Sequence, residues 1–331
     1  MLIRSFAPLL LVACIDQPVE IAPRTGGPPT SRLSELGLFD DLPSLRPAAG
    51  VVSYDVIAPL WSDGASKSRL IAAPTDHRLT AGDDRWEIPD GTYLVKTFFF
   101  PRDARDPSLG RQLLETRVIA FTTDSVAQAT FVWNAEQTDA VSSGGNLDLA
   151  VRWIDETGAP REQTHHVPGT SQCGSCHRGG SDSLALGIRT PELAIAGQLD
   201  ALVAAGVVDR APPPTTPFVD PYGDAALDAR ATSYLEMNCA HCHSPGGEAA
   251  STKLDWRRDH VADAICRSTP SIAGRTRVIV PGAPGESALL ARMTSTNPFQ
   301  HMPRGPSHVP DDRAIAMLGA WISALSPAGC P

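Results

Sequence analysis

Residues Tyr234 to Gly247 read YLEMNCAHCHSPGG, in which two cysteines stand two residues apart and a histidine directly follows the second. A related string, QCGSCHRGG, occupies residues 172–180. Three chemistries use cysteine pairs of this kind: zinc binding, dithiol exchange and covalent attachment of haem. The choice among them decides which fold is expected for the second half of the chain.

The spacing and the adjacent histidines favour haem. In a C-x-x-C-H motif the two thiols form thioethers with the porphyrin, and the histidine becomes the proximal ligand of the iron. A zinc ribbon separates its cysteine pairs by about 15–20 residues, whereas residues 177–238 make up 62 residues here. No βαβ pattern typical of a thioredoxin-like dithiol surrounds either pair. We therefore expect two haem c groups, held by thioethers at Cys173, Cys176, Cys239 and Cys242 and by proximal ligands at His177 and His243.

The residues around the second motif predict a mainly helical domain of the class I cytochrome c type. Residues 223–238, GDAALDARATSYLEMN, favour a helix capped by Asp224. Residues 310–327, PDDRAIAMLGAWISALSP, place apolar residues at helical spacing between two prolines. Two helices flanking a haem loop are the minimum that such a domain needs.

The distal ligand of the second haem is expected at Met302. This residue lies in a Met-Pro loop, FQHMPRGPSH, just before the last predicted helix, and a methionine ligand raises the potential of a haem iron. A gap-filling core methionine is the alternative role. We expect the neighbouring His301 to be exposed in its loop.

The distal ligand of the first haem is left open by the sequence. His165 and His166 precede Cys173 in QTHHVPGTSQC and are weak candidates. The alternatives are ordinary strand-end histidines, with a ligand from elsewhere in the chain or none at all.

The remaining sequence predicts a multidomain α+β protein. Residues 50–167 contain runs rich in β-branched and aromatic residues, such as TYLVKTFFF and DLAVRWIDE, between glycine-containing turns. They predict an antiparallel, sandwich-like β domain, in which the loop APLWSDGASKSRL packs Trp61 on the sheet or, less favoured, forms a ligand site. The first haem segment (168–210), with a helix opened by Thr190 and Pro191, a proline-rich linker (211–217) and the second haem domain (218–331) follow.

The N-terminus reads MLIRSFAPLLLVACIDQ, a charged residue followed by a short apolar run. This pattern indicates a secretory signal, and LVAC resembles a lipobox, so residues 1–14 predict a lipoprotein signal that ends at a lipidated Cys14. A plain signal peptide with an incidental cysteine is the alternative. Residues 15–49 are rich in proline and glycine and predict a tether. The expected location is the periplasm or cell surface, with a lipid anchor in a membrane.

Charge and the other cysteines add two expectations. The net charge is −9, which argues against a surface that binds nucleic acid. Once the lipobox and motif cysteines are assigned, Cys266 and Cys330 remain. In an exported protein they predict a disulfide, with two unpaired thiols as the alternative.

Several strings together resemble a family of predicted dihaem c-type cytochromes of bacterial cell envelopes, which have a β-rich N-terminal part. The strings are IAPLWSDGASKSR, PDGTYLVKTFFF, LLETRV, FVWNAEQTDA, QCGSCH, NCAHCH and HMP, and the likeness runs over residues 50–325. The resemblance implies haem binding at the six motif residues, Met302 as a further ligand, and electron transfer, but no defined substrate.

The sequence therefore predicts an electron carrier that exchanges electrons with other redox proteins of the cell envelope. One alternative is a haem-dependent oxidoreductase, similar to dihaem peroxidases, with an open iron at the first haem. Another is a redox or ligand sensor that uses the β domain as its receptor. Fold class does not choose among these functions.

Overall fold

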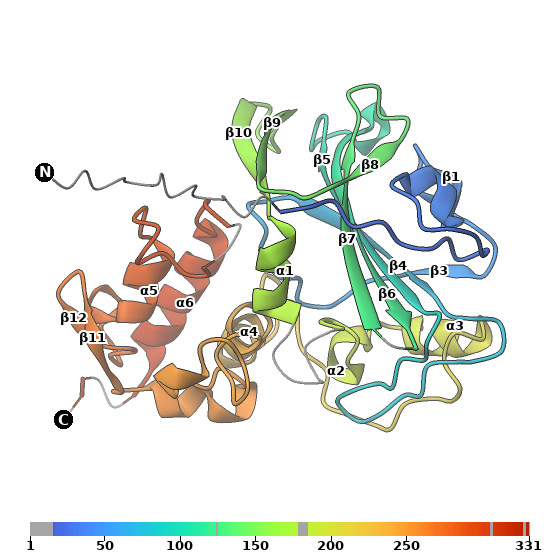
Figure 1. Cartoon of the computed structure of the whole chain (residues 1–331). Coiled ribbons are helices and arrows are strands. Elements are labelled where there is room, and N and C mark those ends of the chain that lie inside the picture. The colour runs from blue at the N-terminus through green and yellow to red at the C-terminus, as the bar shows by residue number, and fades with distance from the viewer. Residues whose placement is uncertain (1–15, 124, 178–184, 305–306, 327–328, 331) are drawn as a thin grey trace, which may run out of the picture.

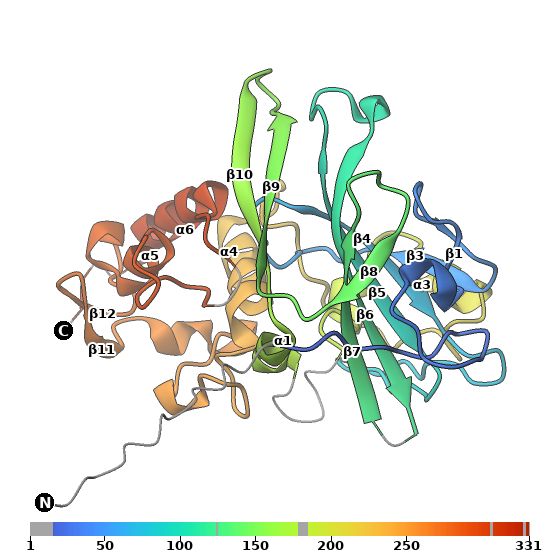
Figure 2. The same ribbon diagram turned by 45° about the horizontal axis from the view of Figure 1, so that its top comes forward.

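The computed structural model describes residues 16–123, 125–177, 185–304, 307–326 and 329–330. The predicted signal sequence and Cys14 lie outside these residues. The chain is 23% helical and 28% strand, which confirms the mixed α+β class. A β part and a mainly helical part lie beside each other, and helix α1 (Thr170–His177) lies between them (Figures 1 and 2).

The β part is built on a six-stranded antiparallel sheet in which the strands follow chain order. Its strands are β3 (Val51–Tyr54), β4 (Ser66–Ala72), β5 (Tyr93–Pro101), β6 (Arg111–Thr122), β7 (Ser125–Trp133) and β8 (Ala140–Ser143), with the turn η2 (Pro107–Leu109) between β5 and β6. Successive residues of a strand point to opposite faces, yet Leu70, Ile71 and Ala72 of β4 are all buried. Both faces of the sheet are therefore covered.

The segment before the sheet covers one of these faces. It contains η1 (Leu33–Leu36), β1 (Phe39–Asp41) and β2 (Arg46–Pro47), and Leu33, Leu36 and Leu38 are fully buried against the sheet. The expectation that residues 15–49 form a tether is therefore wrong for most of this range. The proline and glycine residues predicted an unpacked segment, but the leucines among them bury enough apolar surface to fix it.

The other face is covered by residues that follow the first cysteine motif. Helix α2 (Thr190–Leu193) and helix α3 (Gln198–Ala204) pack with Val207 and Val208 against this face. The single helix expected from Thr190 onward is broken, because Gly197 adopts a left-handed conformation (φ 75°) between α2 and α3. This part of the predicted first haem segment thus belongs to the core of the β part.

The expected sandwich is not formed by the described strands. Strands β9 (Leu147–Ile154) and β10 (Pro160–Val167) form a separate two-stranded sheet beside the main sheet (Figure 1). An isolated bridge between Ile154 and Asp103 joins this sheet to the segment after β5. Val151 of β9 packs on the extended ends of β5 and β6, near Phe98 and Phe100. Because the N-terminal segment and α3 already cover the main sheet, a second full sheet has no apolar face left to cover.

The helical part holds the second motif. Its elements are α4 (Leu227–Leu235), η3 (Glu236–Ala240), η4 (Ala250–Thr252), η5 (Arg258–Ala264), β11 (Ser268–Ile272), β12 (Arg275–Arg277), η6 (Pro284–Glu286), α5 (Ala288–Met293) and α6 (Asp312–Ala324). Asp311 caps α6 by accepting the N–H of Ala314 at 3.0 Å. The cap expected at Asp224 is not formed, since α4 begins later, after Ala226.

A disulfide joins Cys266 and Cys330, the pair predicted from the cysteine count, with Cα atoms 5.3 Å apart. It fixes the end of the chain to the loop before β11. Within the described ranges, no helix has both the length and the apolar character needed to cross a membrane.

Candidate functional site

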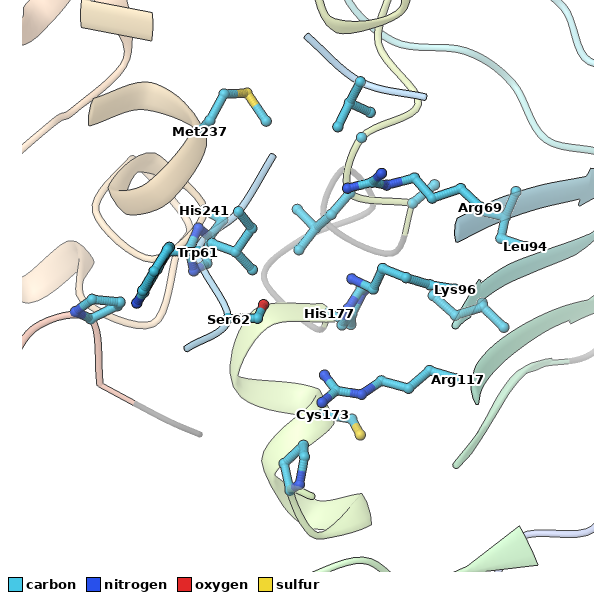
Figure 3. Close-up of a pocket in the computed structure, with 18 of the residues that line it drawn as sticks. Trp61, Ser62, Arg69, Leu94, Lys96, Arg117, Cys173, His177, Met237 and His241 are labelled. Atoms are coloured by element: carbon cyan, nitrogen blue, oxygen red, sulfur yellow. The ribbon is translucent and has the colours of Figure 1, made fainter. Parts of the chain in front are cut away.

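A cavity of about 310 Å³ lies between the sheet, α1 and the helical part. Cys173 and His177 of the first motif line it from α1, while Met237, Ala240 and His241 line it from the region of the second motif. Figure 3 shows Cys173 and His177 on α1, with Met237 and His241 on the side of the helical part. The first motif therefore borders the cavity with Cys173 and His177, whereas, among the described residues, the second borders it only with Ala240 and His241, the two residues between its cysteines.

Local geometry explains how α1 presents the first motif. The helix follows directly on β10 through Pro168 and Gly169, and its first N–H, from Thr170, donates to the carbonyl of Gly144 at 3.0 Å. Residues four apart share a helix face, so Cys173 and His177 both face the cavity. Cys176 lies in the same helix, but its side chain is outside what the structure describes.

The second motif lies on a π-helical turn, η3, at the end of α4. The N–H of His243 donates to the carbonyl of Cys239 at 2.8 Å, which closes one helical turn around the motif. The hydroxyl of Thr252 lies 3.2 Å from Nδ1 of His243. Burial, followed by the charges of His241 and Arg292, lowers the pKa of His243 to about 4. The imidazole is therefore neutral near pH 7, as an iron ligand must be, and Nδ1 is oriented by a neighbour.

Cys239 of the second motif lies in an apolar surrounding, where it packs against the helical core. Burial raises the pKa of its thiol to about 12. A thioether carries no charge and suits this surrounding, so Cys239 fits covalent attachment of a haem.

Met302 lies beside α5. Its N–H donates to the carbonyl of Arg292 at 3.1 Å, and its side chain is half-buried. The charge of Arg292 also acts on His243. The pairing of Met302 with His243 on one iron stays a prediction from the sequence.

His301 is buried, with 7% of its surface exposed, so the expectation of an exposed loop histidine is wrong. Its Nδ1 lies 2.8 Å from the carbonyl of Ser295. Its Nε2 is buried and has no hydrogen-bond partner among the described residues. An imidazole with one ring nitrogen held by a hydrogen bond and the other buried without a partner resembles a metal ligand. Competition of His301 with Met302 was the less favoured alternative from the sequence, and its burial strengthens that alternative.

His165 and His166 both line the cavity but differ in their partners. Nε2 of His165 lies 2.9 Å from the buried carboxylate of Glu115, which also pairs with Arg117 at 2.6 Å. Although burial raises the pKa of Glu115, Arg117 and the hydrogen bond from His165 lower it to about 2. His165 therefore supports a buried ion pair. Nδ1 of His166 lies 2.8 Å from Asp148, so Nε2 is the atom of His166 that can bind a metal.

The loop containing Trp61 and Asp63 connects the two parts of the molecule. Asp63, with 3% of its surface exposed, accepts hydrogen bonds from the Ser307 hydroxyl at 2.8 Å and from the N–H groups of His308 and Val309 at 2.9 Å.

The backbone N–H of Trp61 donates to the Asn238 side chain at 2.7 Å, and the indole N–H of Trp61 donates to the Val309 carbonyl at 2.7 Å. The loop thus holds both the residue before Cys239 and the segment after Met302. We name these hydrogen bonds, made by Trp61 and Asp63, the interdomain clasp.

The expectation that this loop packs Trp61 on the sheet is incomplete, because the hydrogen bonds of Trp61 go to the helical part. One local signal was present in the sequence. An Asp-Gly pair at Asp63 favours a left-handed turn, and Asp63 has φ 52°. The partners of the loop could not be read from local pattern.

A second junction is formed by buried charges at another side of the cavity. Arg189 pairs with Glu236 at 2.7 Å and with Asp84 at 2.6 Å, and it lies 3.5 Å from Glu192. Oε2 of Glu192 is buried without a hydrogen-bond partner in the described part of the chain. Burial, which outweighs the attraction of Arg189, raises the pKa of Glu192 to about 7.

This raised pKa predicts a pH-dependent stability. The folded protein holds the proton of Glu192 more tightly than the unfolded chain, so the contribution is complete below the unfolded pKa of about 4.3 and is lost as the pH rises through about 7. We expect the free energy of unfolding to fall by about 3 kcal/mol between pH 4.5 and pH 8 through this group. Glu192→Gln should flatten this fall in urea unfolding curves. The exposed variant Glu286→Gln is the control, and parallel pH profiles for all three proteins would contradict the assignment.

Comparisons of the chain with protein-family models, with curated proteins and with solved structures gave no match. The resemblance to envelope dihaem cytochromes therefore stays a prediction from the sequence strings.

Proposed function

We propose that the protein is a dihaem c-type cytochrome that transfers electrons in the bacterial cell envelope. The observation that carries this proposal is that the chain holds two C-x-x-C-H motifs, the first of which lines the cavity through Cys173 and His177. In the described part of the chain, the second motif reaches the same cavity only through Ala240 and His241, so haems attached at the two motifs would lie in neighbouring parts of the structure, as electron exchange between them requires. Partners would be other redox proteins of the envelope, reached from the periplasm or cell surface, with an anchor at Cys14.

The residues of the chain have distinct roles in this proposal. Cys173 with Cys176, and Cys239 with Cys242, would attach the two haems, and His177 and His243 would bind the irons from the proximal side. When bound, each haem takes up and releases one electron at its iron. Thr252 lies within hydrogen-bond distance of Nδ1 of His243 and would orient it, Met302 would be a further ligand of the second haem, and the apolar cluster around Cys239 would keep water from that site.

The first experiment is a haem count with absorption spectra of the protein, produced in a host that attaches haem c. We expect two haems that stay bound to the chain after denaturation, and one haem in the double variant Cys173→Ala, Cys176→Ala. A chain without covalent haem would refute the proposal. The wild-type spectra should be recorded oxidised, reduced, and reduced under carbon monoxide.

The carbon monoxide spectrum separates a carrier from a catalyst. If neither reduced haem binds carbon monoxide, both irons have two axial ligands, which supports electron transfer alone. If one haem binds carbon monoxide in the wild type and loses this response in the Cys173, Cys176 double variant, the first iron is open. That outcome would favour a haem-dependent oxidoreductase similar to the dihaem peroxidases.

A further inference from the structure

Glu192 of α2 is a buried carboxylate on the wall of the cavity. Only 1% of its surface is exposed, and it lines the cavity together with Cys173 and His177. The backbone around it is fixed, because its carbonyl accepts the N–H of Ile57 at 3.0 Å and α2 packs in the core of the β part. The side chain is therefore held at the cavity rather than turned out to solvent.

Glu192 shares one cation with two other carboxylates. Arg189 pairs with Glu236 at 2.7 Å and with Asp84 at 2.6 Å, whereas its contact with Glu192 measures 3.5 Å. Glu192 thus receives the longest of the three contacts. The charges of Glu236 and Asp84 also disfavour a further negative charge beside them. Of the three carboxyl groups, Glu192 is therefore the one that its surroundings favour in the neutral form.

Two further groups of the described structure interact with the Glu192 charge from the main sheet. Arg69 of β4 attracts this charge, but its guanidinium also pairs with Asp55 at 2.6 Å. Burial raises the pKa of Tyr54 of β3 to about 12, and the charge of Glu192 contributes to this rise. The Tyr54 hydroxyl is therefore neutral near pH 7 and leaves the charge of Glu192 uncompensated from that side.

One oxygen of Glu192 is left without a hydrogen bond. Its Oε2 is buried and has no partner in the described part of the chain. A Cβ added at Gly187 would lie 3.5 Å from Oε2, and Gly187 itself lines the cavity. This oxygen therefore lies against the segment that follows the first motif. A carboxylate oxygen without donors is costly to bury, whereas a carboxylic acid carries no charge.

Charge that is added at the first motif acts on this carboxyl group. In the proposed function one electron reaches the iron bound by His177, which makes that side of the cavity more negative by one charge. Two charges interact more strongly across a buried cavity than across bulk water. Reduction should therefore increase the proton affinity of Glu192, and a proton from water can compensate for the electron.

We propose that Glu192 takes up one proton from water when the haem attached at Cys173 and Cys176 is reduced, and releases it when that haem is oxidised. In the balanced step the iron gains one electron from a redox partner, while a new O–H bond converts the carboxylate of Glu192 into a carboxylic acid. The inference rests on the proposed function and adds to it that the first haem couples electron transfer to proton transfer. Because the coupling is reciprocal, deprotonation of Glu192 lowers the potential of this haem.

Redox titrations at a series of pH values test the proposal. In the wild type we expect the potential of the first haem to fall as the pH rises through about 7, because the deprotonated carboxylate stabilises the oxidised iron. Glu192→Gln keeps the shape of the side chain but cannot release the proton. Its first wave should stay near the potential that the wild type has at low pH. The exposed variant Glu286→Gln should follow the wild type.

An infrared difference spectrum, reduced minus oxidised, identifies the group directly. Near pH 7 the wild type should gain a C=O band of a carboxylic acid on reduction, and Glu192→Gln should not. The wild-type spectrum also tests the proposal if the variant does not fold, because a reduction that adds no carboxylic acid band would contradict it.

The outcomes separate this inference from the proposed function. Absence of covalent haem in the wild type would refute the function and the inference together. Two haems in the wild type with a first wave that does not depend on pH around 7 would refute the inference alone. A pH dependence that persists in Glu192→Gln would also refute it, since another group would then carry the proton. The first wave is identified as the one that is lost in the double variant Cys173→Ala, Cys176→Ala.

Discussion

Asp63→Ala is expected to lower the free energy of unfolding by about 4 kcal/mol, because it removes a buried carboxylate with several hydrogen-bond donors. Asp63 accepts from the hydroxyl of Ser307 and from the N–H groups of His308 and Val309. Hydrogen bonds to a charged group contribute about 1.5–3 kcal/mol each, and donors left buried without a partner add a cost. The loss should be larger than that of any exposed aspartate of the chain.

Urea unfolding followed by circular dichroism measures this effect. Asp76→Ala is a matched control, because Asp76 is exposed and contacts only its neighbour His77 among the described residues. We expect this control to change the free energy of unfolding by less than about 0.5 kcal/mol. Asp63→Asn keeps the shape but exchanges one acceptor for a donor, and it should lie between the two. A stability of Asp63→Ala close to that of the control would show that the interdomain clasp is dispensable.

The strands and the last helix were predictable because their signals are local. The spacing of Ile315, Leu318 and Ile322 and the proline before them predicted α6. Strands β5, β6 and β7 were also found, but the expected loop APLWSDGASKSRL includes the start of β4, so that expectation is wrong from Ser66 onward, and the environment of the strands was misread. Leu70, Ile71 and Ala72 form a continuous apolar run, and such a run indicates a strand covered on both faces rather than half of a sandwich. The leucines of the supposed tether supply one of these covers.

The two C-x-x-C-H motifs could be recognised from sequence because the residues of each are adjacent in the chain, and their assignment to haem stays a prediction. The interdomain clasp could not, since the hydrogen bond between Asp63 and Ser307 joins residues 244 apart, and that between Trp61 and Asn238 joins residues 177 apart. The alignment of Arg69, Lys96 and Arg117 on neighbouring strands was hidden for the same reason, because each of these residues is ordinary in its own strand. Only the register of β4, β5 and β6 brings the three charges together.

Met302→Leu is expected to open the iron of the second haem if the proposed function is correct. Leucine has nearly the same volume but no sulfur to bind iron, so the change should cost less than about 1.5 kcal/mol of stability. We expect the reduced second haem to bind carbon monoxide, and its potential to fall because the methionine ligand that raises it is gone. Spectra under carbon monoxide and a redox titration measure both effects. The wave of the first haem should not move.

Met317→Leu is the matched control, since Met317 is buried in the core on α6 and should leave the spectra unchanged. The competing ligand is His301, whose buried Nε2 is oriented by the bond from Nδ1 to Ser295. If Met302→Leu leaves the iron closed to carbon monoxide while His301→Gln opens it, His301 is the distal ligand and our assignment is wrong. A histidine ligand would also give the second haem a lower potential in the wild type than a methionine ligand does. The two variants therefore decide whether Met302 or His301 is the ligand that sets the potential of this haem.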